Sequence, residues 1–145
     1  MLDQPTQTRS GEELDIQKLQ DYLCNKVPGF DKEVSIKQFP GGYSNLTYFI
    51  QADDHEYVLR RPPFGANIKS AHDMEREFTV LTKLQDAGFT KIPDAVHLCI
   101  DESVMGVKFY LMKRIKGVIL RNRLPKDISV SEETFRSLSK ANIDQ

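Results

Sequence analysis

The stretch from Pro40 to Arg61, PGGYSNLTYFIQADDHEYVLRR, constrains the fold more than any other part of the sequence. A glycine pair lies near its start, and two strand-like runs follow, Leu46 to Ala52 and Glu56 to Arg61. The polar turn between them, Asp53-Asp54-His55, is typical of a β-hairpin. Because glycine has no Cβ, such a turn can bring backbone N–H groups close to a phosphate, and a strand arginine can bind the same phosphate. Most glycine turns in hairpins are only turns, so this stretch alone leaves both interpretations open.

The composition indicates one modest globular domain. The chain has 145 residues, a formal net charge of −1, 39% hydrophobic residues and 28% charged residues, which argues against disorder. Scattered Lys and Arg residues favour neither nucleic acid nor a membrane surface as partner, and no apolar stretch reaches the roughly 18 residues of a membrane span. Cys24 and Cys99 are far apart and His55, His72 and His97 have no metal-ligand spacing. With an N-terminus unlike a signal peptide, these features predict a cytoplasmic protein without disulfide or structural metal.

The remaining pattern predicts an α+β fold, with a five-stranded antiparallel sheet, one long packed helix and a preceding N-terminal helix. Alternation of apolar and polar residues predicts further strands at Val34–Phe39, Ala95–Asp101 and Lys108–Met112. Residues 1 to 9 are expected to be a loose tail, and Glu102–Gly106 a turn.

Capping-box spacing predicts where two helices begin. Ser10 and Glu13 have this spacing before the N-terminal helix, which should end before Pro28. The long helix is expected over Ala71–Ala87 with Gly88 as its C-terminal cap, and the same spacing precedes it at Ser70 and Asp73.

The long helix carries one charged residue on its apolar face. On a wheel of about 100° per residue, Glu77 lies within the face that we expect to contact the sheet. A carboxylate there is costly unless a cation meets it, and Arg60 and Arg61 point to opposite faces of their strand, so one of them can reach Glu77. The alternative is that Glu77 reaches the rim without an important partner. The apolar residues of this face are Met74, Phe78, Val80, Leu81 and Leu84.

Four segments in order resemble the N-terminal lobe of the aminoglycoside phosphotransferase and choline kinase-like family, whose members are relatives of the protein kinases. The resemblance covers about residues 34 to 120. It is greatest to the subgroup that also occurs joined to acyl-CoA dehydrogenase domains. The segments are GGYSNLTY (Gly41–Tyr48), YVLRRPP (Tyr57–Pro63), MEREFTVLTKL (Met74–Leu84) and FYLMKRIKG (Phe109–Gly117).

The resemblance implies an ATP-binding site. Arg60 would hold the α- and β-phosphates, Glu77 would orient Arg60, and Val58 would cover the adenine ring. The alternatives are that Val58 and Met112 are plain core and that Lys113 and Arg114 form a solvated strand end. The turn expected over the phosphates is Gly42, Tyr43, Ser44 and Asn45, and the hinge expected to contact the adenine edge is Met112, Lys113, Arg114 and Ile115.

The resemblance also implies the reaction, transfer of the γ-phosphate of ATP to the hydroxyl of a small molecule, with ATP and Mg²⁺ as cofactors. In this family the catalytic aspartate and the Mg²⁺ ligands come from a C-terminal lobe, and neither Asp127 nor Asp144 lies in a matching motif. We therefore expect no catalytic residue in this chain and predict that the segment alone is inactive.

The expected organisation is an N-terminal tail and helix (residues 1–33), a kinase-like N-lobe (residues 34–113), and a hinge with the beginning of a truncated C-lobe (residues 114–145). The last part includes a helix over Ser129–Ala141 and suggests a fragment of a longer protein. A non-catalytic module that binds nucleotide or protein is the alternative function. The truncated lobe could also associate with itself through the hinge and the last helix.

Overall fold

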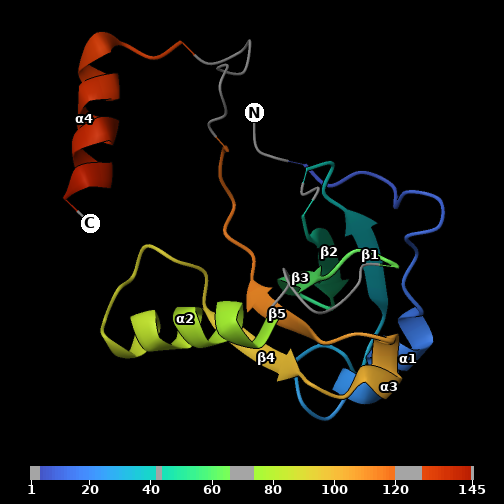
Figure 1. The fold of residues 1–145 in the computed structure, drawn as a ribbon. Helices are drawn as coiled ribbons and strands as arrows, with labels where there is room; N and C mark the ends of the chain where they lie inside the picture. Colours follow the sequence, from blue (N-terminus) through green and yellow to red (C-terminus); the bar gives the residue numbers. More distant parts are fainter. Residues whose placement is uncertain (1–3, 42–43, 66–73, 120–128, 145) are drawn as a thin grey trace. The chain divides into compact units, whose positions relative to one another are not determined.

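The computed structural model describes residues 4–41, 44–65, 74–119 and 129–144 (Figure 1). The chain divides into two compact units, one of them Gln4–Ile115, here called the sheet unit. The other contains α4 (Glu132–Ile143), which begins after its N-cap Ser131 and so starts and ends slightly later than predicted. Within the described residues, no helix is both long and apolar enough to cross a membrane.

The sheet has five antiparallel strands, as predicted, in the order β1-β2-β3-β5-β4 (Figure 1). The two chain-adjacent pairs β1–β2 and β2–β3 are followed by β5, which lies between β3 and β4. The predicted strand bounds are correct for β2 and differ by one or two residues elsewhere. The strands are β1 (Val34–Gln38), β2 (Leu46–Ala52), β3 (His55–Arg61), β4 (Ala95–Cys99) and β5 (Phe109–Lys113).

One face of the sheet carries the hydrophobic core. Side chains from the three central strands, among them Tyr48, Leu59 and Leu111, are fully or almost fully buried there and pack with Leu19 and Leu23 of α1 (Ile16–Leu23). Successive strand residues point to opposite sides, so the alternate residues of these strands form the opposite face.

The start of α1 differs from the prediction. Asp15, not Ser10, is the N-cap, and its Oδ1 accepts a hydrogen bond from the Lys18 N–H at 3.1 Å. The reason lies at Gly11, whose φ of 85° is incompatible with a right-handed helix. For residues 4 to 9 the expected loose tail is also wrong, because Thr6 exchanges two backbone hydrogen bonds with Gln38 at the end of β1.

The long helix α2 (Met74–Asp86) packs against β4 and β5 (Figure 1). Its predicted start and the capping pair before it lie outside the described residues. The helix ends one residue before the predicted Ala87, and the predicted cap Gly88 is confirmed. Gly88 has a φ of 80°, and the N–H groups of Gly88 and Phe89 donate to the carbonyl oxygens of Gln85 and Leu84, an αL ending of the Schellman type.

The face of α2 that contacts the sheet is rotated from the predicted one. Val80 and Leu84 are 49% and 37% exposed, whereas Phe78 and Leu81 are half-buried and Met74 is buried. The Phe78 ring meets the ring of Tyr110 in β5 edge-on, with centroids 5.9 Å apart. The helical wheel therefore predicted a packed face whose centre is too close to Val80.

Two smaller features are the turn after β4 and the state of the cysteines. The expected turn after β4 contains a single turn of helix, α3 (Glu102–Met105), which ends at Gly106 with a φ of 76°. Both cysteines are free thiols, and of the two only Cys99 is buried.

Candidate functional site

The register of the sheet sets out two rows of side chains on the face opposite the core. Thr47, Arg60 and Tyr110 stand side by side across β2, β3 and β5. The next row along the strands contains Phe49, Val58 and Met112. Residues two apart in a strand share a face, so both rows belong to one surface.

Glu77 of α2 meets the first of these rows. Its Oε2 accepts a hydrogen bond from Arg60 Nε at 3.1 Å, and the two side chains are 34% and 29% exposed, respectively. The contact predicted between a strand arginine and the helix glutamate is therefore confirmed, and Arg60 is the partner. An ion pair this accessible adds little stability, so its main consequence is the orientation of the guanidinium.

Two further donors hold the Glu77 carboxylate. The Tyr110 hydroxyl donates to Oε2 at 2.9 Å, and the Asn45 Nδ2 group donates to Oε1 at 2.8 Å. Hydrogen bonds to a charged acceptor are stronger than neutral ones, and three donors from β3, β5 and the segment before β2 leave the carboxylate little rotational freedom. We call Asn45, Arg60, Glu77 and Tyr110 the Glu77 cluster.

The surroundings of Tyr110 raise the pKa of its hydroxyl. Burial is the main cause that raises this pKa above its ordinary value; Arg60 opposes the shift and the hydrogen bond to Glu77 adds to it. The hydroxyl therefore stays protonated, which is the form that can donate to a carboxylate.

Arg61 lies on the other face of β3. Its side chain is buried, its Nε donates to the Pro62 carbonyl oxygen at 3.1 Å, and its guanidinium carbon is 3.8 Å from the centroid of the Phe64 ring. Burial lowers its pKa. Arg61 is thus a structural residue, and of the arginine pair Arg60 is the one that faces the Glu77 cluster.

The residues expected to contact the phosphates are partly described. Gly42 and Tyr43 lie outside the described residues, and Ser44 is exposed. Asn45 is buried, and its side chain binds Glu77. The side-chain role of Asn45 was not predicted from the sequence, nor was any role for Tyr110.

The residues expected around the base occupy the second row and the strand end. Val58 is buried beside half-buried Met112. The N–H groups of Lys113 and Arg114 donate to the carbonyl oxygens of Asp94 and Glu56 at 2.8 and 3.1 Å. These two N–H groups are therefore unavailable to a base edge unless they leave the sheet, whereas Ile115 comes after the last strand residue and is exposed.

The family is shown by comparison with known proteins. The phosphotransferase enzyme family matches residues 35–141. Chicken (Gallus gallus) acyl-CoA dehydrogenase family member 11 is 33% identical over 144 residues, which are 97% of this chain and 18% of that protein. Mouse (Mus musculus) acyl-CoA dehydrogenase family member 10 is 40% identical over 89 residues, 61% of this chain and 8% of that protein. This chain therefore spans less than a fifth of the length of these curated relatives.

A solved structure agrees with the family match. A crystal structure described as an aminoglycoside phosphotransferase from Ralstonia eutropha superposes with a TM-score of 0.59 at 33% identity, over 81% of this chain and 32% of that one. The five-stranded sheet with its packed helix thus has a kinase-like phosphotransferase fold, as the four sequence segments predict. The chain belongs to the phosphotransferase enzyme family.

Proposed function

We propose that this chain supplies the nucleotide-binding part of an ATP-dependent phosphotransferase that acts on the hydroxyl of a small molecule. The observation that carries the proposal is the Arg60–Glu77 pair, whose side chains are 3.1 Å apart and 29% and 34% exposed on the sheet face opposite the core. Family membership supports the reaction class.

Arg60 is suited to bind phosphate. Its guanidinium is planar, stays charged at every physiological pH and carries several N–H donors. Glu77 engages its Nε and Nη2 side, at 3.1 and 3.5 Å, while 29% of the side chain remains exposed. A guanidinium held in this way can present its remaining donors to phosphate oxygens with less loss of side-chain entropy than a mobile arginine.

The Glu77 cluster acts by positioning Arg60. Tyr110 and Asn45 fix the carboxylate, and the carboxylate fixes the guanidinium. Asn45 is also the last residue of the turn expected over the phosphates. ATP brings the transferable phosphoryl group, and this chain's residues bind and orient the phosphates. Among the described residues, no group of three or more His, Cys, Asp or Glu side chains could hold a metal ion, so the proposal assigns no Mg²⁺ ligand to them.

Calorimetric titration of Mg-ATP into the purified chain and into Arg60→Ala tests the proposal. Loss of charge-assisted hydrogen bonds to a phosphate costs about 1.5–3 kcal/mol, so we expect the affinity to fall about 10- to 100-fold. Arg136→Ala is the control, because Arg136 is an exposed α4 residue paired with Glu132 in the same helix. Equal affinities for the chain and Arg60→Ala, or no saturable binding at millimolar Mg-ATP, would contradict the proposal.

A further inference from the structure

A second ion pair lies on the same sheet face, beyond Val58 as seen from Arg60. Arg114 follows β5 and stands opposite Glu56 of β3, with the Arg114 N–H donating to the Glu56 carbonyl oxygen. Arg114 Nη1 is 3.3 Å from Glu56 Oε2, and the Arg114 side chain is only 9% exposed. The Glu56 side chain is 24% exposed. A part-buried pair of this kind fixes the arginine side chain more firmly than a fully exposed pair does.

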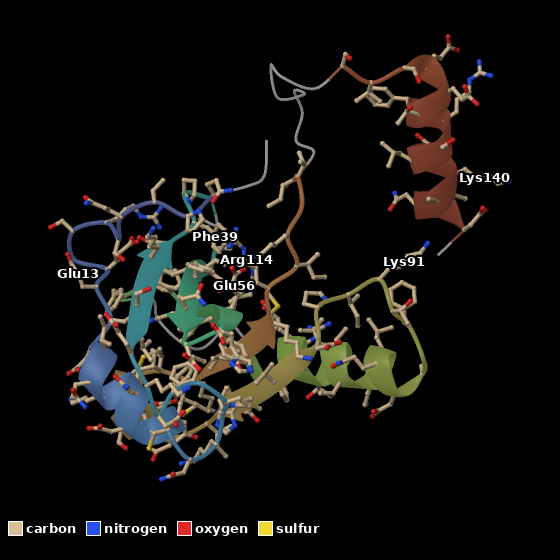
Figure 2. All side chains as sticks on the ribbon, turned by 180° about the vertical axis from the view of Figure 1, so that it is seen from behind. Glu13, Phe39, Glu56, Lys91, Arg114 and Lys140 are labelled. Carbon is tan, nitrogen blue, oxygen red and sulfur yellow. The ribbon has the colours of Figure 1, made fainter. Side chains whose placement is uncertain are left out.

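The Arg114 guanidinium lies over two aromatic rings. Its central carbon is 4.7 Å from the centroid of the Phe49 ring and 5.9 Å from that of Phe39. Figure 2 shows Arg114, Glu56 and Phe39 close together at one end of the sheet. Both distances are within the range of cation–π contacts, and an arginine stacks on aromatic faces particularly well.

The Phe49 ring lies beside Val58, the residue that the family resemblance places against the base. Phe49 is paired with Val58 in the register, and both are buried. Phe39 directly precedes the Pro40-Gly41 turn and is tied to β2 by its N–H, which donates to the Thr47 carbonyl oxygen at 3.0 Å. A flat base in contact with Phe49 would need the space that the guanidinium fills, since stacked atoms approach to about 3.5–4.0 Å.

We propose that Arg114 sets the nucleotide affinity by occupying the base-stacking surface of Phe49 and Phe39, with Glu56 as its anchor, so that the base must displace it. This inference rests on the proposed function, because it assumes that the nucleotide lies between Val58 and Arg60. The base gains the aromatic surface, and the guanidinium leaves its two rings for solvent. The nucleotide therefore binds less tightly than it would bind to the same aromatic surface without Arg114.

Separate titrations of Mg-ADP and of magnesium tripolyphosphate test the inference, because only the first ligand has a base. We expect Arg114→Ala to bind Mg-ADP about tenfold more tightly than the unaltered chain does, the equivalent of about 1.4 kcal/mol. Its tripolyphosphate affinity should stay the same or fall slightly, since a positive charge is lost. Glu56→Gln releases the anchor only, so its Mg-ADP affinity should rise in the same direction by a smaller factor.

A second measurement on the unaltered chain does not depend on the folding of a variant. The Arg114 Nε–H resonance, assigned by sequential connectivities, should be shifted upfield by the Phe49 ring. Saturation with Mg-ADP should return it toward the value of a solvated arginine. A resonance that keeps its upfield position in the Mg-ADP complex would overturn the inference.

The outcomes separate this inference from the proposed function. If the unaltered chain binds Mg-ADP and Arg60→Ala weakens that binding, but Arg114→Ala leaves it unchanged or weaker, the inference alone is wrong. An equal gain for Mg-ADP and tripolyphosphate would also overturn it, because the effect would not involve the base. If the unaltered chain binds neither Mg-ADP nor Mg-ATP, both the inference and the proposed function fail.

Discussion

Tyr110 and Arg60 donate to the same oxygen of Glu77, at 2.9 and 3.1 Å. Because Tyr110 and Arg60 are directly opposite each other in β5 and β3, this shared acceptor ties helix α2 to the centre of the sheet. The guanidinium orientation thus depends on both the pairing of β3 with β5 and the packing of α2.

Tyr110→Phe removes one donor to Glu77 and leaves the ring in place. A hydrogen bond from a buried hydroxyl to a carboxylate is worth about 1.5–3 kcal/mol, and the partial exposure of Glu77 puts the expected loss of unfolding free energy at about 1–2 kcal/mol. Urea denaturation measures this loss of unfolding free energy. Tyr57→Phe is the matched control, because the Tyr57 hydroxyl donates to the neutral Pro28 carbonyl oxygen on the opposite face. Only Tyr110→Phe should also weaken Mg-ATP binding. Equal effects of both variants on that binding would show that Tyr110 does not act through Glu77.

Asn45→Asp replaces a donor to Glu77 by a second carboxylate of nearly the same shape. Two adjacent carboxylates raise each other's pKa in the folded protein. The free energy of unfolding of the variant therefore decreases as the pH rises through these raised pKa values. We therefore expect the variant to be less stable than the unaltered chain by about 1–3 kcal/mol at pH 7 and by clearly less at pH 4. Urea denaturation at the two pH values checks this. A deficit that does not depend on pH would contradict the assigned Asn45–Glu77 contact.

His97, on the core side of the sheet, should make the stability of the sheet unit depend on pH. Its Nε2 lies 3.1 Å from the Tyr22 hydroxyl, and burial, followed by the nearby Lys26 charge, lowers its pKa below the ordinary 6.5. The unfolded chain therefore binds a proton more readily, and stability should fall as the pH drops from about 6.5 toward the folded-state pKa. Urea denaturation between pH 5 and 7.5 should show this slope, and His97→Gln should flatten it. An unchanged slope in the variant would assign the effect to another group.

Gly29 provides a test of backbone geometry. Its φ is 87°, and a Cβ added there would lie 2.3 Å from the Ala52 carbonyl oxygen at the end of β2. Gly29→Ala should cost about 3 kcal/mol or more, from a strained backbone and a clash with main-chain atoms. Gly11→Ala is the control, because Gly11 has a φ of 85° but no atom within 4 Å of the added Cβ, so about 1 kcal/mol is expected. Similar losses in urea denaturation would mean that the clash is relieved.

Local rules predict that one strand arginine can contact Glu77, and the family resemblance implies that this arginine is Arg60. Strand alternation separates Arg60 from Arg61, and helical periodicity puts Glu77 on the packed side of α2. The partners Tyr110 and Asn45 do not follow from such rules. Tyr110 reaches Glu77 because β5 lies between β3 and β4, and the strand order of a sheet is not encoded in the periodicity of any one strand.

The errors have similar causes. A wheel weights every apolar residue equally, so Val80 and Leu84 shifted the predicted face of α2, whereas the sheet beneath it receives Phe78 and Leu81. The spacing of Ser10 and Glu13 fits a capping box, but the positive φ of Gly11 between them excludes a helix that begins at Ser10. Both features depend on the conformation that the rest of the chain imposes.

The central claim is that Glu77 acts on nucleotide through Arg60, and a double-mutant cycle in Mg-ATP affinity tests it most directly. Calorimetry would compare the unaltered chain, Arg60→Ala, Glu77→Gln and the double variant. Glu77→Gln keeps the shape of the side chain and should weaken binding about three- to tenfold, because Arg60 loses its orienting charge. In the Arg60→Ala background the same change should have no effect, or a slight gain from removing a negative charge near the phosphates. An equal weakening in both backgrounds, or tighter binding by Glu77→Gln alone, would contradict the claim.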